Sequence, residues 1–224
     1  MYNIQNNSSV VSISKLCLLI LIFFGFVDTG RSQSTTSSAT SWSTSSSWNT
    51  NAVPAASGAV NVNNPLTISS NINCLGNYTI NAAITDPAGG ADYNLVLGDN
   101  NTTGTMIFYA NGSFGGKLTL NQAGILYVKS GATLTIGEAG DVGEKAVFEK
   151  DCKVVIESGG TLIINGDVTN MNQSNDFEVN GSFIVKGTLT ATGAQSSVYG
   201  TGNVVANSYT GVGLIMGVQG SSIV

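Results

Sequence analysis

The feature that most constrains the fold is a pattern of about twelve residues that occurs three times in the second half of the chain. The copies lie at 125–136, 153–164 and 176–185, and the third is shorter at its turn. The matching positions Val128 and Ile156 are 28 residues apart, and Ile156 and Val179 are 23 apart. Short strands and small turn residues at such a period are typical of a solenoid, in which each repeat stacks on the next.

Each copy also predicts which side chains point inward. Side chains of a strand alternate between its two faces, and stacked coils lie about 4.8 Å apart, so the apolar positions align into ladders. We expect glycine-bearing corners at Ser130-Gly131, Ser158-Gly159-Gly160 and Asn180-Gly181, where a positive φ costs little. The predicted inward residues are Leu126, Val128, Leu134, Ile136, Val154, Ile156, Leu162, Ile164, Phe177, Val179, Phe183 and Val185.

A further apolar run, Ala146-Val147-Phe148, lies between the first two copies and indicates three strands per coil. We therefore predict an all-β chain, a right-handed parallel β-helix (β-solenoid) with an N-terminal cap. A β-sandwich also uses many short strands and is the alternative, although a sandwich has no reason to repeat one turn at one place. The solenoid is expected at 53–208, with less regular coils over 53–123.

Residues 1–32 have the features of a secretory signal peptide. Lys15 precedes the 12 apolar residues 16–27, and small or polar residues follow up to Gln33. Such a run is short for a bilayer span, so we expect cleavage, a secreted product and no membrane span in the mature chain. An uncleaved membrane anchor is the alternative.

Residues 33–52 form a Ser/Thr-rich leader that contains Trp42 and Trp48. Serine-rich stretches are flexible linkers, but large aromatic side chains favour burial, and a solenoid needs a cover over the end of its core. We interpret the tryptophans as part of the N-terminal cap. A pair of sugar-stacking aromatics is the alternative.

The opening of the mature chain is similar to that of many bacterial secreted right-handed parallel β-helix and adhesin-like surface proteins. The similarity rests on Trp42-Ser43-Thr44, Trp48-Asn49, Pro54, Ala59–Val62 and Leu66–Ile68, followed by coils of the Ser-Gly-Ala-Thr-Leu-Thr-Ile kind. The resemblance implies a repetitive, secreted protein that is associated with the cell surface.

Composition excludes several kinds of chemistry. The chain has no histidine, which excludes a Ser-His-Asp triad and histidine-bound metals. Cleavage after residue 32 would remove two of the 8 basic residues and one of the 13 acidic residues, so the mature chain is acidic and binding to nucleic acid is disfavoured. We predict no enzyme, no cofactor, and no catalytic or metal-binding residue.

The densest acidic run lies at 138–151, where lysines are interspersed. We interpret it as a solvated surface. A calcium site and a pair of catalytic carboxylates are the alternatives. Its residues are Glu138, Asp141, Glu144, Glu149 and Asp151, with Lys145 and Lys150.

Cys74 and Cys152 are the two cysteines beyond the predicted signal peptide. They are separated by 78 residues, or three to four coils, which is farther than a disulfide bond can span. We expect two separate, buried thiols.

The outward positions of the three copies suggest how the surface is used. Thr133 and Thr135 resemble the start of a threonine ladder, as in solenoids that bind ice or crystalline polymers, but Ile163 and Ile184 replace threonine in the next copies. We therefore expect the ladder to break after one coil. Together with Val155, these two isoleucines indicate an outward face that a loop or another chain covers.

The last segment, 209–224, is apolar, glycine-rich and uncharged. It is either a last coil or an edge through which chains associate. The sequence favours a non-enzymatic adhesin-like or structural component of the cell surface, with a second copy of itself or a surface glycan as the candidate partner. A carbohydrate-binding module and a β-helix carbohydrate-active enzyme are the rivals.

Overall fold

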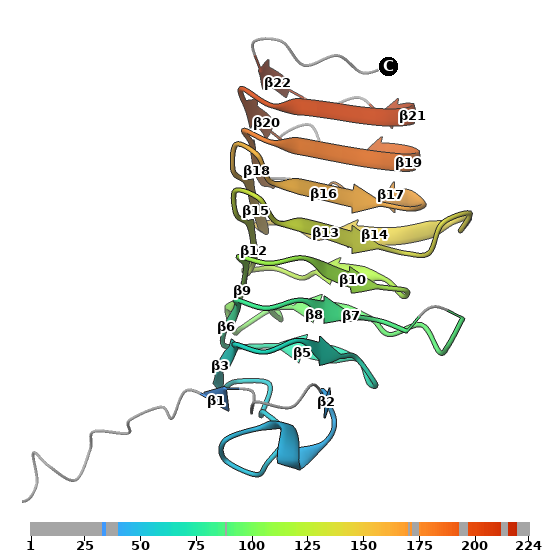
Figure 1. Cartoon of the computed structure of the whole chain (residues 1–224). Helices are drawn as coiled ribbons and strands as arrows, with labels where there is room; N and C mark the ends of the chain where they lie inside the picture. The colour runs from blue at the N-terminus through green and yellow to red at the C-terminus, as the bar shows by residue number, and fades with distance from the viewer. Residues whose placement is uncertain are drawn as a thin grey trace, which may run out of the picture. The chain divides into compact units, whose positions relative to one another are not determined.

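The computed structural model describes residues 33–34, 40–87, 89–169, 171, 175–192, 197–211 and 215–218. These residues form a β-solenoid, and every strand pair among them is parallel. Successive coils rise with a right-handed turn, as Figure 1 shows. The predicted β-helix is confirmed, and the β-sandwich is wrong, because sandwich sheets are antiparallel. The predicted signal peptide, 1–32, lies outside the described residues.

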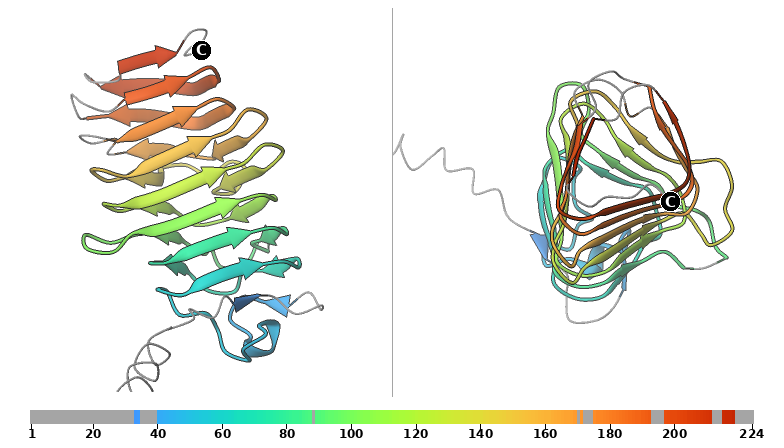
Figure 2. Two further views of the ribbon diagram at one scale, coloured as in Figure 1. Left: turned by 90° about the vertical axis from the view of Figure 1, so that its left-hand side faces the viewer. Right: turned by 90° about the horizontal axis from the view of Figure 1, so that it is seen from above.

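The strands line three faces of a column that is triangular when seen along its axis (Figure 2). Face 1 is a sheet of nine strands, each paired with the strand one coil away. Its strands are β1 (Gln33–Ser34), β3 (Ala59–Val62), β6 (Asn77–Ile80), β9 (Gly104–Phe108), β12 (Gly124–Val128), β15 (Lys153–Ile156), β18 (Asp176–Val179), β20 (Ser197–Gly200) and β22 (Ile215–Val218).

Faces 2 and 3 join at the last two coils, where single long strands pass through both. β19 (Ser182–Ala191) and β21 (Asn203–Gly211) pair along their length, and their register shifts at the corner between Val185 and Thr188. Face 2 otherwise consists of β2 (Thr40–Ser41), β4 (Leu66–Thr67), β7 (Ile84–Thr85), β10 (Gly112–Phe114), β13 (Thr133–Ile136) and β16 (Thr161–Ile164). Face 3 consists of β5 (Ile72–Cys74), β8 (Leu95–Leu97), β11 (Leu118–Leu120), β14 (Glu144–Phe148) and β17 (Asp167–Thr169).

The three copies of the repeat stack in the expected register. Val128 pairs with Ile156, and Ile156 pairs with Val179 on face 1. Leu134, Leu162 and Phe183 align in the same way on face 2. All twelve predicted inward side chains are fully buried. The ladders therefore form the core, since each apolar residue lies above a similar one of the previous coil.

The three predicted corners use glycine for two different reasons. Gly131 and Gly159 adopt positive φ values of 80° and 82°, as expected of these turns. Gly181 does not have a positive φ, so that expectation is wrong there. A Cβ at Gly181 would lie 2.2 Å from the carbonyl oxygen of Gly160, so the third corner requires glycine because two backbones approach closely.

The N-terminal end of the core contains both tryptophans. Trp42 and Trp48 are 3% and 0% exposed, and their rings meet edge to face at 5.1 Å. The Trp48 Nε1 donates a hydrogen bond to the carbonyl oxygen of Trp42, and the Trp42 ring stacks on Tyr78 of β6 at 5.9 Å. The prediction that the tryptophans are buried against the first coil is confirmed. The only described helix, the 3₁₀ turn η1 (Ser45–Ser47), lies between them.

The two thiols are separate and buried, as predicted. Burial raises the pKa of each to about 12, so neither is a reactive thiolate near neutral pH.

At the C-terminal end, part of the predicted tail continues the coils. β21 extends to Gly211, and β22 pairs with β20 as the first strand of a further coil. Residues 212–214 and 219–224 of the tail lie outside the described residues. Within the described part of the chain, no helix is long and apolar enough to cross a membrane.

Candidate binding surface

The outward side chains of face 2 form two rows that run along the axis of the column. The register places one residue of each coil beside the equivalent residue of the next. We call them the first row and the second row of face 2. The first row is Ser41, Thr67, Thr85, Ser113, Thr135, Ile163, Ile184 and Val205. The second row is Asn111, Thr133, Thr161, Ser182 and Asn203.

Neither row contains a charged residue, although the chain is acidic. The outward positions of the other two faces do carry charges. Lys153, Asp176 and Glu178 lie on the outer side of face 1, and Lys117 and Asp167 lie at the edge of face 3. The two rows of face 2 are therefore neutral, whereas charged residues of this face, Asp86, Glu138 and Lys186, lie beside the rows.

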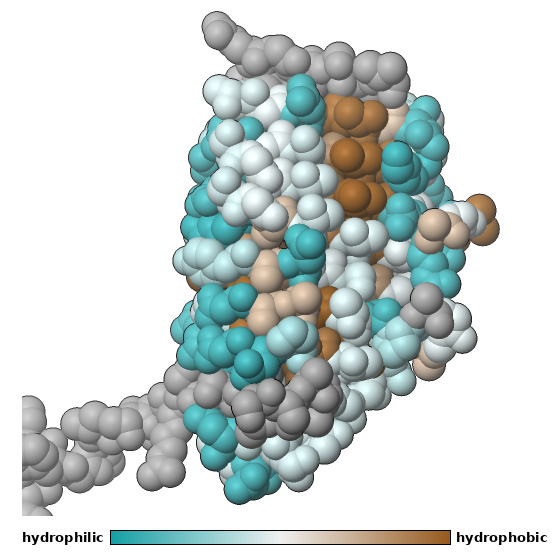
Figure 3. All heavy atoms as spheres, viewed as in Figure 1, coloured by the Kyte–Doolittle hydropathy of each residue, from teal (hydrophilic) through white to brown (hydrophobic). Residues whose placement is uncertain are grey.

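The first row changes character along the column. Its residues from Thr67 to Thr135 carry hydroxyl groups, and the next three are aliphatic. Figure 3 shows the aliphatic part as a continuous hydrophobic stripe over β16, β19 and β21. β-Branched residues dominate both halves, which suits the pleated surface of a strand.

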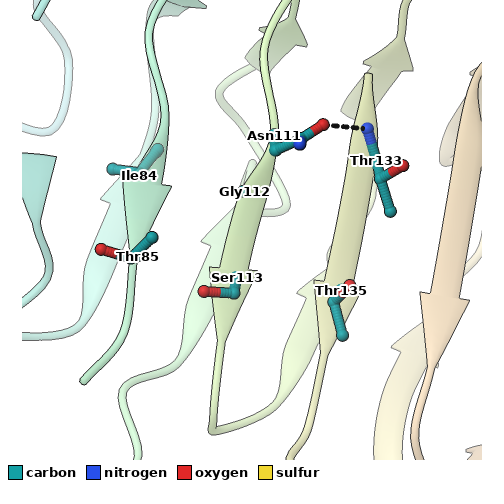
Figure 4. A pocket seen from close by; sticks show the side chains of 7 residues that line it. All are labelled: Ile84, Thr85, Asn111, Gly112, Ser113, Thr133 and Thr135. Carbon is teal, nitrogen blue, oxygen red and sulfur yellow. Dashed lines mark hydrogen bonds between the residues drawn. The ribbon is translucent and has the colours of Figure 1, made fainter. Parts of the chain in front are cut away.

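A shallow depression of about 180 Å³ lies over the hydroxyl half. Thr85, Ser113 and Thr135 lie across three adjacent strands in this view, with Asn111 and Thr133 beside them (Figure 4). The Asn111 Oδ1 accepts a hydrogen bond from the backbone N–H of Thr133 at 2.8 Å, which fixes the edge of the depression. The hydroxyl groups of Thr85, Thr133 and Thr135 have no hydrogen-bond partner among the residues that the structure describes.

A second depression, of about 480 Å³, adjoins the first and shares Ser113 and Thr135 with it. Asp86 lies at its edge, and the Asp86 Oδ2 accepts hydrogen bonds from the backbone N–H groups of Tyr93 and Gly115. The Asp86 Oδ1 is buried and has no donor within the described part of the chain. A buried acceptor without a donor is costly, so this oxygen marks a place where a donor would be favourable.

The acidic run 138–151 is spread over separate ion pairs. Asp141 binds Lys145 at 2.7 Å, Glu144 binds Lys117 of the preceding coil, and Asp151 lies 3.8 Å from Lys150. Among the described residues, no three Cys, Asp or Glu lie close enough together to hold a metal ion. The ion pairs agree with the interpretation of this run as a solvated surface.

Face 1 has its own cluster, built around Lys129. Its Nζ lies 2.6 Å from Glu157 and within 6 Å of the ring centroids of Tyr109 and Tyr127. The hydrogen bond between the two charged groups raises the pKa of Lys129 and lowers that of Glu157. Tyr109 is 53% exposed, but the charged groups beside it, Lys129 and Glu157, are already paired with each other.

Two interpretations of the outward positions need correction. The threonine ladder does end at Ile163, but it runs on in the other direction through Ser113 and Thr85 to Thr67. Val155 does not share a face with Ile163 and Ile184. It lies on β15 between Tyr127 and Glu178 of face 1 and is only 7% exposed.

The ladder was missed because the earlier coils lack the repeat pattern. A loop after Thr85 lengthens one coil, and β4 and β7 are only two residues long, so no sequence period links Thr67, Thr85 and Ser113. The sequence signal for this ladder is that Thr67, Thr85 and Thr135 each directly follow a buried aliphatic residue.

No family model, curated protein or solved structure matches this chain.

Proposed function

We propose that this chain is a secreted, non-enzymatic β-solenoid that acts as an adhesin-like component of the cell surface and attaches to its partner through face 2. The observation that carries the proposal is that two outward rows, of eight and five residues on successive coils, contain no charged residue. A face that is regular, flat and neutral suits attachment to a repetitive partner.

The rigidity of the column supports a role in attachment. Continuous buried ladders hold the outward rows at fixed spacing, so a partner meets a preformed surface and little conformational entropy is lost on binding. The features of residues 1–32, which are typical of a secretory signal peptide, support a place outside the cell.

A carbohydrate-active enzyme is less well supported by the same residues. Glycoside hydrolysis needs two carboxyl groups that flank one bond. Asp141, Glu144, Glu157 and Asp176 each bind a lysine instead. Asp86 and Glu138 do line one depression, but both accept hydrogen bonds from backbone N–H groups, and the remaining oxygen of Asp86 is buried. The thiols are buried with a raised pKa, so they do not serve as nucleophiles either.

Cells that produce the full chain provide the first test. We expect protease added to intact cells to remove the protein, and an antibody to label cells whose envelope is intact. A protein that resists protease until cells are lysed would contradict the proposed location.

Purified protein then tests the role of face 2. We expect labelled protein to be retained on the cells, and Thr135→Lys to reduce this retention by about tenfold, because a charge placed under a neutral partner loses its water. Thr119→Lys is the matched control, since Thr119 is outward on β11 of face 3 between Val96 and Val147. Equal retention of both variants would contradict attachment through face 2.

A further inference from the structure

We propose that face 2 binds a neutral, extended polysaccharide chain that lies along its two rows, parallel to the axis of the column. This inference rests on the proposed function and names the class of its ligand. It is argued from charge, chemistry, dimensions and one unpaired acceptor.

Charge excludes the acidic polymers. The two rows have no lysine that would pair with a uronate, sulfate or phosphate group, and the rest of the surface is acidic. An anionic polymer would be repelled by the acidic protein, and beside the rows it would meet a single lysine on β19, Lys186. A neutral polymer is not repelled by the acidic surface and needs no ion pair to bind.

The chemistry of the rows matches that of a neutral sugar chain. The hydroxyl groups of Thr85, Thr133 and Thr135 have no partner among the described residues, so they are available both to donate and to accept hydrogen bonds. The aliphatic part of the first row, Ile163, Ile184 and Val205, offers apolar contact. A pyranose ring presents hydroxyl groups at its edge and C–H groups on its faces, so it uses both.

The dimensions favour one long ligand over a second copy of this chain. From Thr67 to Val205 the first row has six steps of about 4.8 Å, so it is about 29 Å long. A four-residue strand is about 13 Å long, which sets the width of the face. The area of face 2 that a partner could cover is therefore about 400 Å². A stable protein interface buries about 800 Å² on each partner. Each step is close to the length of one pyranose residue in an extended chain, so successive sugars meet equivalent side chains.

The second depression adds an acceptor at the edge of the rows. The buried Asp86 Oδ1 lacks a donor within the described residues, and Asp86 lines the depression together with Ser113 and Thr135. Because this oxygen is buried, a sugar hydroxyl group would supply the donor only after the loop that follows β7 moves. We assign the hydroxyl half, over β7, β10 and β13, as the part of face 2 that recognises the ligand most specifically (Figure 4).

Electrophoresis in gels that contain a polysaccharide tests the inference. The probes are hydroxyethyl cellulose and barley β-glucan, which are neutral, and alginate, which is acidic. We expect the neutral polymers to retard the purified protein at low and high salt alike, because no ion pair contributes, and we expect alginate to have no effect. Retardation by alginate but not by the neutral polymers would overturn the inference.

Three variants locate the site. Thr135→Lys should abolish the retardation, and Thr135→Val, which keeps the shape but loses the hydroxyl group, should weaken binding by about threefold to tenfold, as expected for one lost hydrogen bond. Thr119→Lys should migrate like the original protein. Thermal unfolding of each variant shows whether the column is intact.

The outcomes separate this inference from the proposed function. If Thr135→Lys loses retention on cells but no neutral polysaccharide retards the protein, face 2 is the attachment face and the ligand class is wrong. If Thr135→Lys and Thr119→Lys both keep retention on cells, the attachment face is wrong as well. Shaping of growing ice crystals by the protein, without retardation in any gel, would show that the ordered hydroxyl groups bind ice and would overturn the inference.

Discussion

Faces 1 and 2 belong to the same column and have the same coil spacing, yet their outer sides are used differently. On face 1 the charged side chains pair from one coil to the next, Lys129 with Glu157 and Lys153 with Asp176. On face 2 the hydroxyl groups of Thr85, Thr133 and Thr135 have no hydrogen-bond partner within the described residues. Face 1 pairs its charges internally, whereas face 2 leaves hydroxyl groups exposed, and for this reason we propose face 2 as the binding face.

This difference shows that the inward positions of a solenoid are constrained by packing of the core, whereas the outward positions are constrained by the surface that the molecule presents. Inward residues must fill the core, so Leu134, Leu162 and Phe183 are all large and apolar. The neighbouring outward residues, Thr135, Ile163 and Ile184, contact no core and are free to vary with the surface that the molecule presents. The comparison can therefore be tested by changing adjacent residues of one strand.

The largest expected effect separates Leu162 from Ile163, which follow each other on β16. Leu162 is fully buried, so Leu162→Asp should lower the free energy of unfolding by about 3–5 kcal/mol or prevent folding, because it buries an unpaired charge. Ile163 points outward, and Ile163→Asp should cost about 1 kcal/mol. Thermal unfolding followed by circular dichroism measures both.

The two variants carry charge at adjacent positions, so each controls for the other. Similar loss of stability in both would mean that the inward and outward rows of face 2 are wrongly assigned. A stable Ile163→Asp variant also allows a further check, since it places a charge in the aliphatic half of the first row and should weaken attachment.

A smaller effect is expected at Asp86, at the edge of face 2. Asp86→Ala leaves the backbone N–H groups of Tyr93 and Gly115 without their acceptor, which should cost about 1–3 kcal/mol. The midpoint of thermal unfolding should fall by several degrees, as is usual for a chain of this size. An unchanged midpoint would mean that the loop after β7 is not held by this side chain.

The sequence predicts the inner half of the structure better than the outer half. Ladders such as Val128, Ile156 and Val179 are visible because burial restricts these positions to apolar residues at regular spacing. The same rule identifies the tryptophan pair at the N-terminal end, since large aromatic residues in a serine-rich stretch favour burial. Core positions must be apolar, and this requirement can be recognised directly from the residue types in the sequence.

The candidate binding site is much harder to predict from the sequence. Thr67, Thr85 and Ser113 become neighbours only through coils of unequal length, and hydroxyl residues are common in loops and strands alike. Asp86 is held through its Oδ2 by backbone N–H groups of Tyr93 and Gly115, which leaves the buried Oδ1 unpaired, and no local sequence pattern predicts this arrangement. The face assignment of Val155 fails for a related reason: three strands follow one another in each coil, so outward residues near in sequence can lie on different faces.

The smallest effect concerns the ion pair of face 1. The hydrogen bond to Lys129 holds the pKa of Glu157 below its ordinary value of 4.5, so the pair stabilises the fold above that pH and its contribution is lost as the pH falls through the lowered pKa. Glu157 is about 40% exposed, so the contribution is below about 1 kcal/mol. Glu157→Gln should therefore unfold at a slightly lower temperature than the original protein at neutral pH, and at the same temperature at strongly acidic pH.

Thr135→Val, on face 2, is the control and should leave the pH dependence of thermal unfolding unchanged. A Glu157→Gln variant whose difference from the original protein stays constant across this pH range would show that face 1 is held by packing rather than by its ion pairs.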